Sequence, residues 1–219
     1  MFRRQFLYQL LVASFSVIVV LSNILSVKLV KLPWLLPSVP AGLITYPLTF
    51  LLSDLVTEIF GARRAKAMVY IALSMSLLSF ALIQWGLILP SEQREMQSAF
   101  HTVLGLTGVR VFSSLIAYVT AQMVDIHLYA AIKRRTGMKW LWLRNNASTC
   151  VSQLVDTVMI DLLFLWWGLS MPMTEVFPIL IFSYVYKTFF SAACTPLFYA
   201  LVFLIRGKKE WKQRGITHV

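Results

Sequence analysis

Long apolar segments with almost no charged residues dominate this sequence, and they constrain its fold more than any other feature. The first runs without a charge from Gln5 to Val27. Five more follow, and each provides about the 20 residues that a helix needs to cross the hydrocarbon core of a bilayer. We therefore predict an all-α integral membrane protein with six transmembrane helices in one bundle. The predicted helices cover residues 6–27, 42–60, 67–89, 109–132, 145–168 and 176–205.

The composition supports this fold class. Hydrophobic residues make up 58% of the 219 residues, charged residues make up 13%, and the mean hydropathy is +0.73. Ordinary soluble domains carry about twice that charged fraction. Since one bundle of this size uses the whole length of the chain, we expect residues 1–219 to form a single transmembrane domain.

The positively charged residues indicate how the helices are oriented. The net charge is +11, which in a soluble protein would suggest nucleic acid as a partner. Here 15 of the 20 Lys and Arg residues fall in segments on one side of the predicted bundle, four fall on the other side, and Lys187 falls within a helix. Because Lys and Arg collect in cytoplasmic loops, both termini are predicted to be cytoplasmic, and no nucleic-acid partner is expected.

Prolines and polar residues mark the breaks between helices. Three prolines between residues 32 and 40 exclude a regular helix there, and Trp34 is expected at the level of the lipid headgroups. Pro47 interrupts the helix predicted for residues 42–60. Residues 91–108 are polar and amphipathic, and they are predicted to form the longest loop.

Six ionisable residues fall inside the predicted helices and are not explained by the topology. A charge within a span costs about 2.5–3.5 kcal/mol on insertion scales, and such residues commonly mark a binding site or a relay. The sequence alone leaves open which of them contact a substrate and which form structural ion pairs. The six are Asp54, Glu58, Asp125, Asp156, Asp161 and Lys187.

Two of these carboxylates share one face of the second predicted helix. Asp54 and Glu58 are four residues apart, and Tyr46 and Phe50 continue the same face. This arrangement is suited to binding a cation, a proton or the N–H edge of a substrate.

Structural ion pairs are the alternative for several of these charges. The carboxylates of the second helix would then be neutralised by Arg63 or Arg64, in the loop predicted to follow it. Lys187 would form an ion pair with Asp156 or Asp161, although a paired lysine can also line a binding site.

The fifth predicted helix carries a polar stripe. Asn146, Thr149, Gln153 and Asp156 recur at intervals of three and four residues, so they share one face. Hydrogen bonding between helices would need fewer polar residues. We therefore interpret the stripe as a wall that faces a ligand, and we expect Asn145 to cap or gate the start of this helix.

Several function classes lack their sequence motifs. The chain contains no Walker A, HExxH or GxSxG sequence, and its three histidines do not have the spacing of a metal site. We expect no metal, no cofactor and no catalytic residues. An intramembrane enzyme that uses Asp54, Asp156 or Asp161 as acid and base is the alternative.

A set of short motifs follows a fixed order along five of the six predicted helices. No single motif is specific, but the ordered set resembles the vitamin uptake transporter (VUT) family, in its branch of queuosine-precursor transporters of the YhhQ type. The motifs are Ser22-Asn23; Tyr46-Pro47-Leu48-Thr49-Phe50-Leu51-Leu52-Ser53-Asp54 with Glu58-Ile59-Phe60-Gly61; Asp125-Ile126-His127; Arg144-Asn145-Asn146 with Ser148-Thr149, Gln153 and Asp156-Thr157; and Tyr184, Tyr186-Lys187 and Thr195-Pro196.

The resemblance implies a fold similar to the substrate-binding subunits of energy-coupling-factor vitamin importers. It also implies a multi-pass protein of the bacterial inner (plasma) membrane. Its substrate would be a planar base, a 7-deazaguanine precursor of queuosine (7-cyano- or 7-aminomethyl-7-deazaguanine, or queuine) that is imported for tRNA modification. The residues expected to bind this substrate are Asn23, Tyr46, Phe50, Asp54, Glu58, Asn146, Thr149, Gln153, Asp156, Tyr184 and Lys187.

The resemblance further implies a solitary carrier, and no part of the sequence marks a docking face for an ATPase module. The alternative is a substrate-capture subunit for another vitamin or nucleobase that depends on a shared ATPase module. The sequence leaves open the preferred precursor, the energy source and the oligomeric state.

Overall fold

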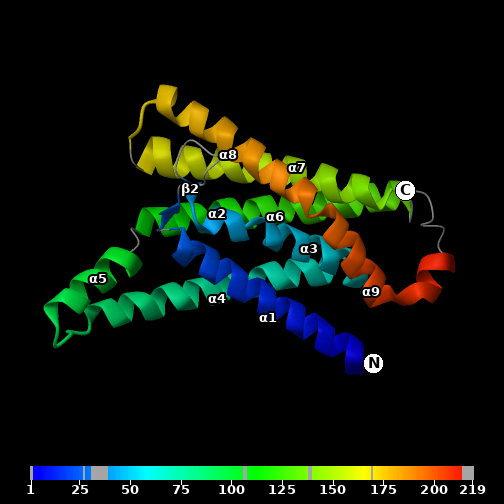
Figure 1. Cartoon of the computed structure of the whole chain (residues 1–219), viewed down its shortest axis with the longest axis horizontal. Coiled ribbons are helices and arrows are strands. Elements are labelled where there is room, and N and C mark those ends of the chain that lie inside the picture. Colours follow the sequence, from blue (N-terminus) through cyan, green and yellow to red (C-terminus); the bar gives the residue numbers. More distant parts are fainter. Residues whose placement is uncertain are drawn as a thin grey trace.

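The protein is a bundle of helices, in which some helices run side by side and others cross one another (Figure 1). The computed structural model describes residues 2–26, 28–30, 39–105, 108–137, 140–168 and 170–213. Its elements are α1 (Phe2–Leu25), β1 (Leu29–Val30), β2 (Val39–Pro40), α2 (Gly42–Thr45), α3 (Pro47–Phe60), α4 (Ala62–Ile88), α5 (Arg94–Leu104), α6 (Gly108–Thr136), α7 (Leu141–Ile160), the π-helix η1 (Asp161–Gly168), α8 (Met173–Ala193) and α9 (Thr195–Gln213).

Within the described ranges, five helical stretches are long and apolar enough to cross a membrane. The prediction of an all-α integral membrane protein is therefore confirmed. The five stretches are Arg4–Leu25, Ala62–Ile88, Phe112–Thr136, Leu141–Gly168 and Met173–Ile205.

The segment predicted as the second span differs from the other five. It forms two helices, α2 and α3, which meet at Tyr46 because Pro47 has no N–H to continue the hydrogen-bond ladder. Tyr46 itself keeps helical backbone angles, with φ −59° and ψ −41°, so α3 continues in nearly the direction of α2.

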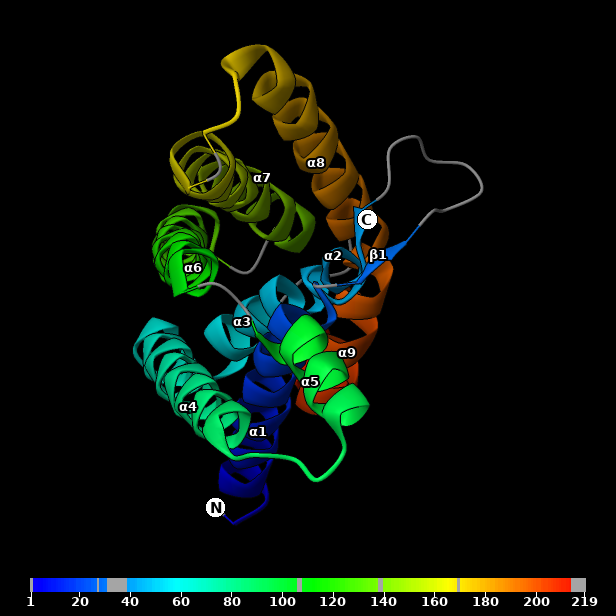
Figure 2. The same ribbon diagram turned by 90° about the vertical axis from the view of Figure 1, so that its left-hand side faces the viewer.

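α3 lies at the centre of the bundle, in contact with α1, α4, α6, α8 and α9 (Figure 2). Ten of its 14 residues are buried. Apolar residues such as Leu55 and Val56 pack against α1 and α4 in the main hydrophobic cluster. The polar residues of α3 are enclosed by other helices, so they face protein and not lipid.

A close contact fixes the start of α2 against the end of α1. A Cβ atom added at Gly42 would overlap the Ser22 carbonyl oxygen and the Ser26 hydroxyl, so only glycine allows this approach. The Ser22 and Thr45 hydroxyls then hydrogen-bond across the two helices at 2.7 Å. This contact brings Tyr46 and α3 to their position in the bundle.

The start of α4 corrects the prediction of a basic loop after residue 60. α4 begins directly after Gly61, whose φ of +89° makes the sharp turn from α3. Arg63 and Arg64 therefore lie in the first turn of a helix. Arginine and lysine are good helix formers, which explains why a helix continues through a segment that charge counting assigns to a loop.

The start of α7 also differs from the prediction. The helix begins at Leu141 and not at residue 145, so Arg144 belongs to its first turn. Asn145 is consequently not an N-cap residue, and that prediction was wrong. A helix that begins earlier turns Arg144 into the bundle, where it is 0% exposed.

Two further boundaries were predicted incorrectly. The segment expected to be the longest loop contains α5, an 11-residue amphipathic helix that packs beside α4. The last predicted span is two helices, α8 and α9, which meet at Cys194 because Pro196 begins a new helix. Of the predicted proline-rich connector, Val39 and Pro40 form β2, which pairs with β1 in antiparallel fashion, while Trp34 lies outside the described residues.

Candidate functional site

The candidate site is a column of buried polar side chains where α3, α6 and α7 face one another. Each member is less than 9% exposed, although the helices that carry them are mainly apolar. Buried polar groups on these helices recur every three or four residues, which keeps them on one face of each helix. We call this set the polar column: Thr49, Ser53, Asp54, Glu58, Gln122, Asp125, Tyr129, Arg144, Thr149, Ser152, Gln153 and Asp156.

An ion pair closes one end of the polar column. The Lys187 ammonium of α8 donates to Asp156 Oδ2 at 2.8 Å and to the Thr157 hydroxyl at 3.3 Å. The Tyr46 hydroxyl donates to Asp156 Oδ1 at 2.7 Å, and its ring lies 5.3 Å from the Lys187 nitrogen. The Phe50 ring meets the Tyr46 ring edge-on at 5.7 Å. This end therefore combines a compensated charge pair with two aromatic rings.

The next level of the polar column is rich in unpartnered atoms. Gln153 is 0% exposed, and neither its amide nitrogen nor its amide oxygen has a hydrogen-bond partner among the residues that the structure describes. Gln122 donates weakly to the Thr49 hydroxyl at 3.5 Å, but its amide oxygen also lacks a partner there, as does the Ser53 hydroxyl. We call Ser53, Gln122 and Gln153 the glutamine level.

Unpartnered buried amides destabilise the folded protein. Each buried donor or acceptor without a hydrogen bond costs about 1–3 kcal/mol, because it has lost its water and gained no partner. Native proteins contain few of them, and each one calls for a ligand, an ordered water or a functional role. The glutamine level offers donors and acceptors from three different helices. It is therefore the part of the polar column best suited to receive a polar ligand.

Two carboxyl groups occupy the following level. Asp54 of α3 and Asp125 of α6 are close neighbours, and each has one carboxyl oxygen without a hydrogen-bond partner among the described residues. Asp54 Oδ2 accepts from the Thr149 hydroxyl at 3.4 Å, and Asp125 Oδ1 accepts from the Ser152 hydroxyl at 3.0 Å. No basic side chain in the described part of the chain makes an ion pair with either aspartate.

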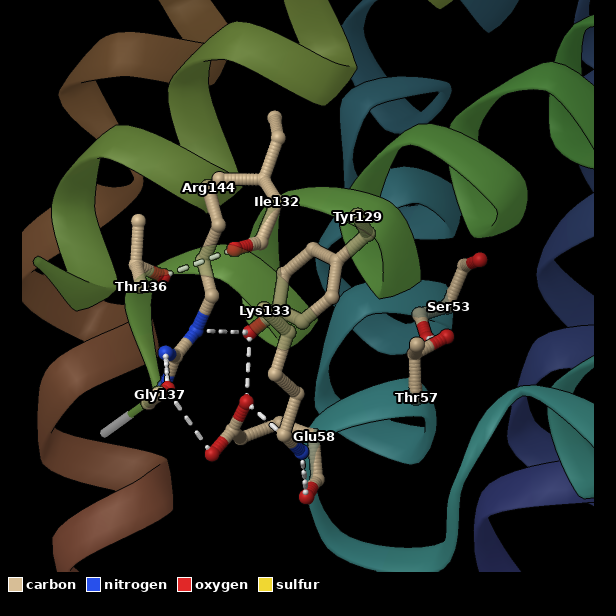
Figure 3. A network of polar contacts seen from close by, with 9 residues as sticks. All are labelled: Ser53, Thr57, Glu58, Tyr129, Ile132, Lys133, Thr136, Gly137 and Arg144. Carbon is tan, nitrogen blue, oxygen red and sulfur yellow. Dashed lines mark hydrogen bonds and ion pairs between the residues drawn. The ribbon is translucent and has the colours of Figure 1, made fainter. Parts of the chain in front are cut away.

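A second ion-pair network closes the other end of the polar column (Figure 3). The Glu58 carboxylate binds Lys133 at 3.0 Å and Arg144 at 3.1 Å, and it accepts the Tyr129 hydroxyl at 3.0 Å. Lys133 also donates to the Glu58 carbonyl oxygen at 2.7 Å, and Arg144 donates to the Gly137 carbonyl oxygen at 2.8 Å. These contacts tie α3, α6 and α7 together, and we call them the Glu58 network.

The Glu58 network revises the expected partner of this carboxylate. In the ion-pair alternative drawn from the sequence, Arg63 or Arg64 was the neutralising residue, since both follow closely in the chain. The structure instead pairs Glu58 with Lys133 and Arg144. Arg64 lies over the Tyr8 and Phe60 rings.

Three other predicted substrate-binding residues lie outside the polar column. Asn23 accepts the Ser114 hydroxyl at 3.0 Å, which links α1 to α6. Asn146 donates to the Trp142 carbonyl oxygen at 2.9 Å and accepts the Thr195 hydroxyl at 3.1 Å, which links α7 to α9. Tyr184 lies beside Cys150 and Thr188.

Sequence reasoning did not select seven residues of the polar column as site residues: Thr49, Ser53, Gln122, Asp125, Tyr129, Arg144 and Ser152. Asp125 was noticed as an ionisable residue inside a predicted helix, but the sequence offered no partner for it. Arg144 was counted as a loop residue. The signal that could have found the three on α6 is a helical spacing of three and four residues, from Gln122 to Asp125 and on to Tyr129.

An apolar groove of about 600 Å³ lies elsewhere, between α1 and α4. Its walls include Val12, Val17, Ile71 and Met75, and none of the predicted site residues lines it. A groove of this composition on the outside of a membrane bundle is suited to lipid chains and not to a polar base.

The sequence as a whole matches one protein family over most of its length. Residues 40–201 match the family described as "Putative vitamin uptake transporter", and this stretch contains the whole polar column. The chain belongs to this family. Membership in the vitamin uptake transporter family agrees with the resemblance carried by the motifs.

Curated proteins from three bacteria are similar to this family member. A "Probable queuosine precursor transporter" of Bacillus subtilis (strain 168) is 33% identical over 141 residues, which cover 63% of this chain and 60% of that protein. The "Queuosine precursor transporter" of Escherichia coli (strain K12) is 26% identical over 125 residues, or 57% of this chain and 54% of that protein. A "Probable queuosine precursor transporter" of Haemophilus influenzae is 26% identical over 116 residues, or 53% of this chain and 47% of that protein.

The match thus spans between about half and 60% of the length of these relatives. No solved structure gives a significant match to the chain. All three of these relatives are named as transporters.

Proposed function

We propose that this protein imports 7-deazaguanine precursors of queuosine across the bacterial inner membrane. The candidates are 7-cyano-7-deazaguanine, 7-aminomethyl-7-deazaguanine and queuine. The observation that carries the proposal is the glutamine level, in a family member whose relatives are named queuosine precursor transporters. Among the described residues, the buried Gln153 amide and the Gln122 amide oxygen have no hydrogen-bond partner.

The chemistry of a deazaguanine suits this part of the polar column. The base has N–H donors on one edge, a carbonyl oxygen and a planar ring. The amides of Gln122 and Gln153 can pair with both kinds of polar group. The Tyr46 and Phe50 rings at the adjacent level can pack against the plane. Asp156 has lone pairs beyond those used by Lys187 and Tyr46, so it can accept from the donor edge.

The remaining predicted residues receive more limited roles in this proposal. Thr149 and Lys187 hold Asp54 and Asp156 in place. Glu58 does not contact the base in this proposal but holds the Glu58 network together. This network must open for a base to leave the polar column at the end opposite Asp156. Asn23, Asn146 and Tyr184 support the helix contacts that shape the site.

The membrane arrangement forms part of the same proposal. The bundle has six spans, of which residues 42–60 form the central one, and both termini lie in the cytoplasm. The Glu58 network then lies at the cytoplasmic end, and the ion pair of Asp156 lies toward the outside. Phosphatase or fluorescent-protein fusions at each terminus test this orientation, and an active periplasmic reporter at either end would contradict it.

The function is tested by complementation in a bacterium that cannot synthesise queuosine and lacks its own transporter. We expect the gene to restore queuosine in tRNA when at least one precursor is supplied in the medium. Purified protein in liposomes should take up the same precursor without a partner, which would exclude dependence on an ATPase module. Absence of queuosine with all three precursors would contradict the proposal.

Replacement of Gln153 by Leu separates binding from stability. The change removes an unpartnered buried amide, so we expect the free energy of unfolding to stay the same or rise by up to about 1–3 kcal/mol. We expect precursor affinity to fall by about tenfold or more, since each lost 1.4 kcal/mol of binding is a factor of ten. Thermal unfolding and precursor binding in detergent measure the two effects.

Gln97→Leu is the matched control for this variant. Gln97 lies on α5 and donates to the Leu87 carbonyl oxygen at 3.0 Å. Its loss should leave precursor affinity unchanged. A Gln153→Leu protein that binds the precursor normally would remove Gln153 from the site.

A further inference from the structure

The Asp54 and Asp125 carboxyls form a pair that the proposed substrate contacts leave unexplained. The two side chains are 1% and 0% exposed, and they contact Thr149 and Ser152, which are neighbours on one turn of α7. Thr149 and Ser152 each satisfy one oxygen of the pair. The other two oxygens, Asp54 Oδ1 and Asp125 Oδ2, have no hydroxyl, amide or cationic partner within the described ranges.

The charges around this pair do not neutralise it. Asp156 is paired with Lys187, and Glu58 is paired with Lys133 and Arg144. Lys133, Arg144 and Lys187 are therefore each engaged with a carboxylate other than Asp54 and Asp125. Several other titratable groups lie on the helices that surround the pair. They are Tyr46 at the start of α3 and Glu58 within it; Tyr118, Tyr129 and Lys133 of α6; Arg144 and Asp156 of α7; Asp161 of η1; and Lys187 of α8.

The remaining neighbours of α3 are apolar. α1, α4 and α9 contribute residues such as Phe15, Met68 and Phe198 to the hydrophobic cluster against this helix. Two carboxylates in contact in such surroundings cannot both be ionised, because their repulsion and desolvation are uncompensated. The unpartnered oxygens of Asp54 and Asp125 can hydrogen-bond to one another only if one of the carboxyls carries a proton.

A second observation places this pair next to the candidate ligand site. Gln153 follows Ser152 directly and lies one turn from Thr149, and both of these residues hydrogen-bond to the pair. The amide of Gln153 is fully buried and has no hydrogen-bond partner in the part of the chain that the structure describes. The carboxyl pair thus adjoins the level where a ligand would bind, on the path from there to the Glu58 network.

We propose that the Asp54–Asp125 pair is a proton-binding site that couples movement of the substrate to movement of a proton. In the closed state one proton is shared between the carboxyls. When the Glu58 network opens, α3 and α6 separate and water reaches the pair. The O–H bond then breaks, the proton passes to water, and the carboxylate keeps the electron pair. The coupling rests on the proposed transport function, whereas the proton site itself does not.

Infrared difference spectroscopy tests the proton site without any substrate. We expect the wild-type protein at neutral pH to show the C=O stretch of a protonated buried carboxyl, shifted in deuterium oxide. Asp54→Asn and Asp125→Asn should each change or remove this band, and Glu175→Gln, at an exposed position of α8, should not. Absence of the band in the wild type would overturn the proton site.

Transport in liposomes tests the coupling. A gradient of one pH unit is worth about 1.4 kcal/mol per proton, or a factor of about ten in accumulation. We expect the wild type and Glu175→Gln to accumulate the precursor about tenfold under an inward gradient of this size, and Asp125→Asn to accumulate none.

The possible failures of this test are distinguishable. Precursor uptake that does not depend on the proton gradient, or that depends on a sodium gradient instead, would overturn the proposed coupling to protons. If the wild type moves no precursor under any gradient but shows the infrared band, the proton site stands and the proposed function fails.

Discussion

We expect Lys187→Met alone to lower the free energy of unfolding by about 3–5 kcal/mol, and the combination of Lys187→Met with Asp156→Asn to recover most of that loss. The single change leaves the Asp156 carboxylate, which is 1% exposed, without its cation at 2.8 Å. An uncompensated buried charge is strongly destabilising, but replacing both members of a buried ion pair by neutral groups is often nearly neutral. Thermal unfolding of the wild type, both single variants and the double variant in detergent measures the effect.

The same four proteins test the role of Asp156 in transport. We expect the double variant to fold and to reach the membrane, yet to take up no precursor, because it lacks the carboxylate that accepts the donor edge. Tyr186→Phe serves as the control. Tyr186 lies next to Lys187 on α8, and this change removes one hydroxyl outside the polar column. Normal uptake by the double variant would contradict a substrate contact at Asp156. A double variant as unstable as Lys187→Met would contradict the ion pair.

Arg144→Met should destabilise the protein by about 3 kcal/mol or more. Arg144 and Glu58 both have fully buried side chains, and their contact of 3.1 Å is supported by Tyr129. Loss of the guanidinium leaves Lys133 as the remaining basic partner of Glu58, and the Lys133 side chain is 27% exposed. Arg134→Met is the matched control, because Arg134 is exposed at the same end of α6, and surface changes usually stay within about 0.5 kcal/mol.

Arg144→Met should also open the polar column toward the cytoplasm. In a background with Cys150 and Cys194 replaced by serine, a cysteine is introduced by Ser53→Cys. This residue is buried above the Glu58 network (Figure 3). We expect a membrane-impermeant maleimide added from the cytoplasmic side to label it faster when Arg144→Met is present. Equal labelling rates would show that the network does not close this end.

Much of the fold follows from the sequence because membrane spans obey a simple rule. A helix in lipid must be long and apolar, and five such helices are found where the sequence predicts them. The break at Pro47 is also predictable, since proline cannot donate to the ladder. The helix ends are less predictable. Clusters of Lys and Arg indicate where a span leaves the membrane, but a helix can continue through them. α4 and α7 both continue past that boundary.

The site is less predictable than the fold for a related reason. Spacing places Thr149, Gln153 and Asp156 on one face, and these three do belong to the polar column. Spacing cannot show which helix that face meets. The partners of Glu58 are distant in sequence, and the partner of Asp54 is an aspartate on another helix. Only the packing of α3 against α6, and its side-chain contacts with α7, bring these groups together.

Binding of the three precursors to the purified protein, measured by calorimetry with guanine as a comparison, tests whether the polar column is a deazaguanine site. We predict saturable binding of at least one 7-deazaguanine, accompanied by a rise in Tm, with affinity reduced about tenfold or more by Gln153→Leu and unchanged by Gln97→Leu. If none of the three precursors binds the wild-type protein, or if Gln153→Leu binds them as tightly as the wild type, the assignment of the polar column as a deazaguanine site is contradicted.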